Sequence, residues 1–137
     1  MKALIDTNIL IDYLTSREPF YENAARIMSL CLFKINGCVS PHSFIDIAYV
    51  LRENFNIGIE DVRNIIQKFS AVLQVATENK DVIVYAAENE NFSDYEDSVQ
   101  NECARTLDVD CIVTRNKKDF ANASVPVLEP KEFLDMF

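Results

Sequence analysis

The sequence predicts an α/β protein in which a central parallel sheet is covered by helices on both faces. Short apolar runs that end in polar residues alternate along the chain with longer segments whose apolar residues are spaced by three and four positions. The first pattern is typical of buried strands, and the second is typical of helices with one apolar face. Strands that alternate with helices form parallel sheets, and ligands bind outside the carboxyl ends of those strands.

The first half of the chain opens with the apolar run at residues 3–5, which we expect to be a buried strand. A helix follows directly in NILIDYL, with Thr7 or Asn8 as its N-cap. Apolar spacing predicts two further helices, at residues 21–34 and 41–54, and the second of them opens with a proline. The segment NGCVS between these helices indicates a turn and a strand.

The second half of the chain continues the alternation. A capping box, with Ser93 as N-cap and Glu96 three residues later, indicates a helix from Asp94 to about Leu107. The other expected elements are a helix at 59–72, a strand in LQVAT, a helix through about 79–89, strands in DCIVT and VPVL, and a final helical turn or two from Pro130.

The composition is that of a globular protein, with 49% hydrophobic and 26% charged residues. The length of 137 residues suits one domain with its own core, so we expect residues 1–137 to form a single unit. The four cysteines form no Cys-x-x-Cys pair, which indicates reduced, packed thiols. No apolar stretch approaches the roughly 20 residues of a membrane span, and Asp6 interrupts the first apolar run. We therefore expect a cytoplasmic protein without a membrane partner.

Acidic residues lie at the ends of predicted strands or in the first turns of helices. Two carboxylates about 4 Å apart repel by roughly 4 kcal/mol at an effective dielectric near 20, so a cluster of acids needs a cation or protons. Hard oxygen ligands without His or Cys favour Mg²⁺ or Mn²⁺, and the matching chemistry is phosphodiester hydrolysis. The acids that separate segments can bring to one edge of the sheet are Asp6, Asp46, Asp94, Asp97 and Asp119.

Each acid also has a structural interpretation. Asp6 can be a helix N-cap, and Asp94 gains from the helix dipole at the first position of its helix. The spacing leaves the interpretation of Asp97 open, and Asp119 can be a surface turn acid. Asp46 lies mid-helix in a stretch that must contribute to the core, where simple solvation is less favourable. The metal-site prediction therefore depends on the common position of these acids.

Three segments of the chain resemble the PIN domain family, in particular the bacterial toxins of the VapC type. These segments are LIDTNILID at the amino terminus, SDYEDSVQNECA in the late helix, and CIVTRNKKDF with VPVLEP behind it. Their order and spacing match over nearly the whole chain. The resemblance implies a three-layer α/β/α fold and a Mg²⁺- or Mn²⁺-dependent ribonuclease with a ring of acids.

The resemblance also assigns site residues by motif position. Asp6 matches the first acid of the ring, Asp97 the third, and Asp119 or the neighbouring Asn116 the fourth. Asp46 stands at the second position, where many PIN domains have Glu, so it reaches a metal either directly or through water. Asp6, Asp97 and Asp119 are the expected metal ligands. Four residues are expected to support the site: Thr114 through its hydroxyl, Asn8 by orienting Asp6, and Asn116 and Asp94 beside them.

The densest basic run of the chain flanks Asp119 and contains Arg115, Lys117 and Lys118. Two interpretations of it are open: the residues hold RNA phosphates, with Arg115 and Lys117 as substrate-binding residues, or they form a solvated loop. His42 precedes Asp46 by four residues, but a lone histidine is more often packed or at the surface than a ligand.

The leading hypothesis is a metal-dependent endoribonuclease that is the toxin of a type II toxin–antitoxin pair. The net charge of −9 weighs against broad binding to nucleic acid and favours an antitoxin with a basic segment. Aromatic residues at helical spacing fit core or dimer contacts, and we expect a homodimer. The alternatives are a catalytically weak PIN-like module that binds RNA or protein, and a phosphatase- or receiver-like domain with Asp6 as nucleophile.

Overall fold

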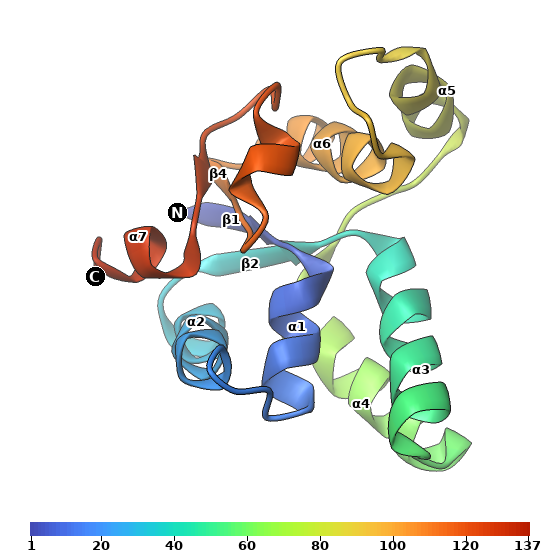
Figure 1. Ribbon diagram of the computed structural model, residues 1–137, viewed down its shortest axis with the longest axis vertical. Coiled ribbons are helices and arrows are strands. Elements are labelled where there is room, and N and C mark those ends of the chain that lie inside the picture. The colour runs from blue at the N-terminus through green and yellow to red at the C-terminus, as the bar shows by residue number, and fades with distance from the viewer.

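The computed structural model describes residues 1–137 and contains a five-stranded sheet with helices on both faces (Figure 1). All neighbouring strands pair in parallel. This arrangement confirms the predicted α/β/α architecture. In their order across the sheet, the strands are β3 (Gln74–Val75), β2 (Asn36–Val39), β1 (Lys2–Ile5), β4 (Cys111–Val113) and β5 (Val127–Leu128).

The helices lie close to the positions that apolar spacing predicts. The best agreement is at α4, which spans Ile59–Val72. Two elements of the second half differ from the predictions. The 3₁₀ helix η1 was not predicted, and β3 is shorter than expected, with only two residues. The remaining helices are α1 (Thr7–Leu14), α2 (Tyr21–Phe33), α3 (Pro41–Phe55), α5 (Lys80–Glu88), α6 (Tyr95–Leu107), η1 (Lys117–Phe120) and α7 (Pro130–Leu134).

Successive residues of the central strand β1 face opposite sides of the sheet and so divide the core. Ala3 and Ile5 pack into a cluster of 18 buried residues that also includes residues of α1, α2, α3, α4 and α7. Leu4 packs on the other face with Ala104 of α6 and Phe120 of η1. Figure 1 shows the same division, with α5 and α6 on one side of the sheet and α1 to α4 on the other.

Two predicted helix caps are wrong. The N-cap position of α1 is occupied by Asp6, and Thr7 is already the first helical residue. The N-cap of α6 is Asp94, whose Oδ1 accepts a hydrogen bond from the backbone N–H of Asp97 at 3.1 Å. Ser93 therefore lies outside the helix, because the residue next to it offers a carboxylate to the same free N–H groups.

The cysteines match their prediction, because all four thiols are free and buried. None of the helices combines the length and the apolar character that crossing a membrane requires. The three central strands end in line, and each is followed by a buried polar residue, namely Asp6 after β1, Ser40 after β2 and Thr114 after β4. The carboxyl edge of the sheet is therefore polar although the strands themselves are apolar.

Candidate active site

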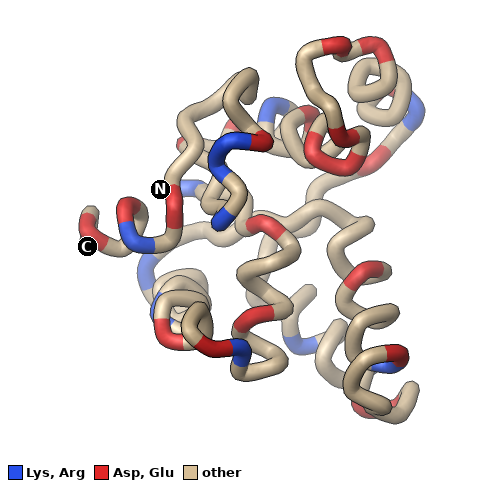
Figure 2. The backbone as a smooth tube through the Cα atoms, viewed as in Figure 1, with Lys and Arg blue, Asp and Glu red and all other residues tan.

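A cleft of about 400 Å³ opens at the carboxyl edge of the sheet, where α1, α3, α6 and η1 meet. No Lys or Arg is among the 13 residues that line it. Figure 2 shows acidic positions on the tube at the start of α1 and α6 and along α3. The cleft therefore concentrates negative charge from four separate segments. Its six carboxylates are Asp6, Asp46, Asp94, Glu96, Asp97 and Asp119.

Asp6 is the most deeply buried carboxylate of the cleft, with a relative exposure of 4%. Its Oδ1 accepts a hydrogen bond from Gln100 Nε2 at 2.9 Å, and its Oδ2 accepts one from Thr114 Oγ1 at 2.7 Å. The side chain makes no capping bond to α1 although Asp6 holds the N-cap position. Asp6 therefore holds the N-cap position, as its structural interpretation has it, but its carboxylate is not used for capping and is fixed at the cleft by two buried donors.

Thr114 stands at the end of β4 with its side chain against Asp6. The backbone N–H of Asn116 donates to Thr114 Oγ1 at 3.0 Å, so the hydroxyl proton is free to point at Asp6. Asn116 itself lines the cleft. The turn after β4 thus couples the position of Asn116 to the orientation of Asp6.

Gln100 was missed by the sequence-based reasoning, which assigned the orientation of Asp6 to Asn8. Asn8 lines the cleft, but the bonds to Asp6 come from Gln100 and Thr114. Gln100 is only 1% exposed, and its Oε1 is buried without a hydrogen-bond partner. The available signal was its place three residues after Asp97, which puts both side chains on one face of α6.

Asp97 enters the cleft from the first turn of α6. Burial raises its pKa to about 7, and the negative charges of three further acids add to the rise, namely Asp94, Asp6 and Asp119. These repulsions place the first, third and fourth predicted acids in one electrostatic group. Asp94 is the N-cap of α6, one position before the first helical residue, and it also contributes charge to the cleft.

Asp119 is an exposed residue of η1, and its backbone N–H donates to the carbonyl oxygen of Asn116 at 2.9 Å. Phe120, the next residue, is 1% exposed and anchors η1 in the core. Asp119 therefore reaches the cleft from a short element whose position is set by a buried aromatic ring.

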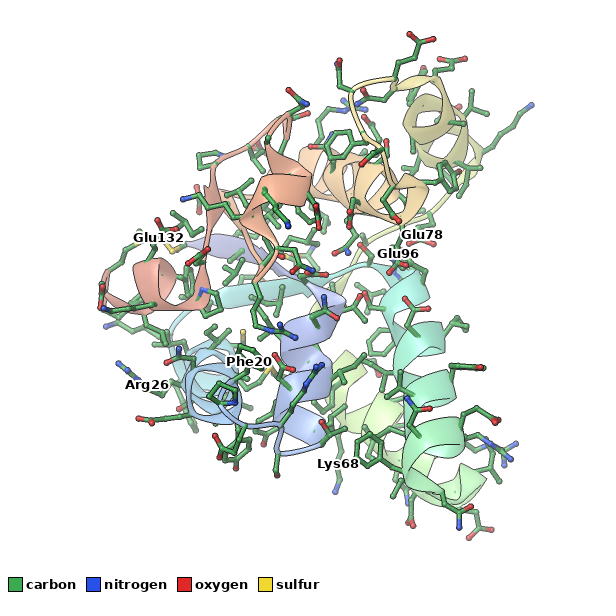
Figure 3. The ribbon with its side chains drawn as sticks, viewed as in Figure 1. Phe20, Arg26, Lys68, Glu78, Glu96 and Glu132 are labelled. Carbon is green, nitrogen blue, oxygen red and sulfur yellow. The ribbon has the colours of Figure 1, made fainter.

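Asp46 lies on α3 and has Glu96 as its neighbour, a residue that the predictions used only as part of a cap. Burial raises the pKa of Glu96 to about 7, and a hydrogen bond to Asp46 and the charge of Asp46 add to the rise. Figure 3 shows Glu96 and Glu78 near the amino-terminal end of α3. Asp46 is thus part of a second acidic group on the rim of the cleft.

A family model described as PIN domain matches residues 2–118. This chain belongs to the PIN domain family. No curated protein sequence matches the chain. Solved structures of PIN toxins are nevertheless similar in fold, and the share of each chain that is covered is at least nine tenths in the examples that follow.

Three such structures come from different bacteria. A toxin–antitoxin complex from Klebsiella pneumoniae has a TM-score of 0.69 at 20% identity and covers 93% of this PIN domain and 97% of its own chain. VapC20 of Mycobacterium tuberculosis, a toxin that cleaves the sarcin–ricin loop, has a TM-score of 0.68 at 17% identity, covering 90% and 95%. VapBC-1 of Haemophilus influenzae has a TM-score of 0.67 at 18% identity, covering 96% and 99%.

The donor set of this PIN domain fits a divalent metal ion with oxygen ligands. Asp6, Asp97 and Asp119 offer carboxylate oxygens, and the cleft lining contains no basic side chain that would neutralise them. Burial and the charges of the neighbouring acids raise the pKa of Asp97, and a cation beside it would offset both effects. The unpartnered Gln100 Oε1 adds a further buried acceptor at the same wall. Mg²⁺ and Mn²⁺ match such a set of hard oxygen donors.

Two residues of the basic run, Arg115 and Lys117, are paired with acids outside the cleft. Arg115 Nε lies 2.6 Å from Asp12 Oδ2 and Arg115 Nη2 lies 3.2 Å from Asp12 Oδ1, and the guanidinium also stacks over Phe20 at 4.0 Å. Lys117 Nζ pairs with Glu132 at 2.8 and 2.9 Å. Neither basic residue lines the cleft. Phosphate binding by Arg115 and Lys117 stays a prediction, and for Arg115 it requires release from Asp12.

Proposed function

We propose that this PIN domain is an endoribonuclease that depends on Mg²⁺ or Mn²⁺. The observation that carries the proposal is the fixed carboxylate of Asp6, with both oxygens held by buried donors beside Asp97 and Asp119. A stabilising role alone does not explain this arrangement, because the acids repel one another and no basic side chain lines the cleft. The fold shared with an RNA-cleaving toxin supports the same reaction class.

Asp6, Asp97 and Asp119 would hold the cation. When bound, a divalent cation supplies the positive charge that attracts phosphate oxygens and makes water a stronger nucleophile. Gln100 and Thr114 orient Asp6, so this ligand is already ordered in the folded protein and loses little conformational entropy when substrate binds. Asn116 presents an amide at the cleft that can donate to a phosphate oxygen.

The partner class follows from the charge of the cleft. Six carboxylates, with no Lys or Arg in the same lining, offer a strong binding surface for a Lys- or Arg-rich peptide. We propose that the chain is the toxin of a type II pair and that a basic segment of an antitoxin covers the cleft. The toxin–antitoxin complexes with the same fold support this proposal.

The test is cleavage of a labelled RNA by purified protein in Mg²⁺ or Mn²⁺, compared with EDTA. We expect cutting by the wild type and its loss in Asp6→Asn and Asp97→Asn. The control is Asp61→Asn, which removes an exposed acid of α4 that does not line the cleft. Equal cutting by all four proteins would reject the site. Absence of cutting by the wild type at saturating metal would favour the catalytically weak binding module.

A further inference from the structure

A second pocket, of about 280 Å³, lies beside the cleft and between α3, α5 and α6. Its polar wall consists of His42, Asp46, Glu78 and Glu96. One ligand atom from each of His42, Asp46 and Glu96 lies within 4.8 Å of the other two. The proposed reaction at Asp6, Asp97 and Asp119 makes no use of the histidine. We call these three residues the His42 group.

Glu78 fixes the orientation of the imidazole. Its Oε1 contacts His42 Nδ1 and also accepts the backbone N–H of His42 at 3.3 Å. A carboxylate at Nδ1 favours the tautomer with the proton on Nδ1, which leaves the lone pair on Nε2. Histidines that bind metals characteristically have such a carboxylate behind the ring. Glu78 lies in the segment before α5, so this contact also ties that segment to the start of α3.

The other ring nitrogen faces the carboxylate of Glu96. His42 Nε2 is buried without a hydrogen-bond partner, and it lies 3.3 Å from Glu96 Oε1. Asp46 follows His42 by four residues on α3, so both side chains lie on one face of the helix. Glu96 arrives from the first turn of α6. A lone pair that faces carboxylate oxygens requires a cation or a proton between them.

The His42 group is open to an incoming ion. The His42 side chain is 20% exposed and the Glu96 side chain is 48% exposed. Asp46 and Glu96 also line the cleft, so the group stands on the shared wall of the two pockets. An ion can therefore enter from solvent without displacing a core residue.

We propose that His42, Asp46 and Glu96 bind a second divalent cation, of the transition-metal class, with Glu78 as the residue that positions His42. One imidazole and two carboxylates suit Zn²⁺, Mn²⁺ or Co²⁺ better than Mg²⁺, which prefers oxygen ligands and water. Three protein ligands would leave at least one coordination position for water. The site goes beyond the proposed ribonuclease activity, because its occupancy requires neither RNA nor Asp6.

The test follows from the single histidine of the chain. In a long-range ¹H–¹⁵N spectrum of tag-free protein, every imidazole nitrogen signal belongs to His42. With one equivalent of Zn²⁺ alone, we expect the Nε2 signal to move to the range of metal-bound nitrogen while Nδ1 stays protonated. Mg²⁺ at the same concentration leaves both signals in place. A Nε2 signal that does not respond to Zn²⁺ overturns the proposal and assigns His42 to a proton-mediated ion pair.

Variants identify the residues that bind the Zn²⁺ ion together with His42 Nε2. Asp46→Asn and Glu96→Gln each weaken the Zn²⁺ affinity read at Nε2 by at least about tenfold, and Glu78→Gln weakens it by about 10- to 100-fold. The control Glu60→Gln, an exposed acid of α4, leaves the affinity unchanged. Unchanged affinity in both Asp46→Asn and Glu96→Gln would contradict the ligand assignment.

The second metal site can be tested independently of the proposed ribonuclease activity. Asp6→Asn is expected to lose RNA cleavage and to keep the Zn²⁺ response of His42. A wild type that never cuts RNA but shows the response supports the second site and rejects the ribonuclease. A wild type that cuts RNA but shows no Zn²⁺ response at His42 supports the ribonuclease and rejects the second metal site.

Discussion

Asp97→Asn should stabilise the metal-free protein while it removes the proposed activity. The folded protein raises the pKa of Asp97 from 3.8 to about 7. A rise of this size corresponds to about 4 kcal/mol when Asp97 is ionised. The carboxyl is partly open to water, and solvent screening reduces the expected effect to about 1–2 kcal/mol. Asn is close to Asp in size and carries no charge, so it relieves the repulsion without a large change in packing.

The size of this gain depends on pH. The unfolded chain ionises Asp97 near 3.8, whereas the folded chain does so only near 7, so ionisation destabilises the fold increasingly as the pH rises through this window. Asn removes this penalty. Chemical denaturation without metal should show a gain of about 1–2 kcal/mol for Asp97→Asn at pH 8 and less than half of that gain at pH 5. Equal or lower stability of the variant at pH 8, or a gain that does not change with pH, would refute the reasoning.

Three further predictions concern single contacts. Arg115→Ala leaves the buried Asp12 with only Arg17, whose Nη1 lies 3.9 Å from Asp12 Oδ1, so denaturation with urea should show a loss somewhat below the about 3–5 kcal/mol of a fully unpaired buried charge. Thr114→Val removes a donor to Asp6, which should cost about 1–3 kcal/mol by the same assay and lower RNA cleavage. Gly37→Ala places a Cβ 2.5 Å from a buried sulfur and 2.8 Å from a leucine methyl group, so thermal denaturation should show a loss of about 1–3 kcal/mol.

Each of these predictions has a matched control. Lys117→Ala breaks an ion pair whose partners are both nearly half exposed, so it should shift the urea midpoint much less than Arg115→Ala. Thr114→Ser keeps the hydroxyl and should retain most of the activity. Gly58→Ala meets open space and should change the melting temperature little. A control variant that lost as much stability or activity as its test variant would contradict the contact proposed for that test variant.

The main elements of the fold were predictable because their signals are local. Apolar spacing located α4 at the residues observed, and apolar runs located β1 and β4. The start of α6 was misplaced because Ser93 and Asp94 are both good caps and only the folded backbone selects between them. Local signals could not find η1, whose position depends on packing of Phe120 against the sheet.

The acids of the site were predictable because parallel strands end at one edge. Asp6, Asp97 and Asp119 line the cleft as their positions in the sequence suggest. The contact of Gln100 with Asp6 could not be predicted from the pattern of charged residues, because Gln100 is neutral. The ion pair of Arg115 could not be foreseen, because Asp12 is 103 residues away in sequence. Contacts of this kind depend on the tertiary arrangement and leave no pattern in a single sequence.

The central claim is that the carboxylates of the cleft are held together for a divalent cation. The most direct test is thermal denaturation with Mg²⁺, at matched ionic strength, of the wild type and Asp6→Asn. At 100 times its Kd, Mg²⁺ should stabilise the wild type by about 2.7 kcal/mol and should leave Asp6→Asn unchanged. Equal stabilisation of the two proteins, or none in the wild type, would contradict the claim.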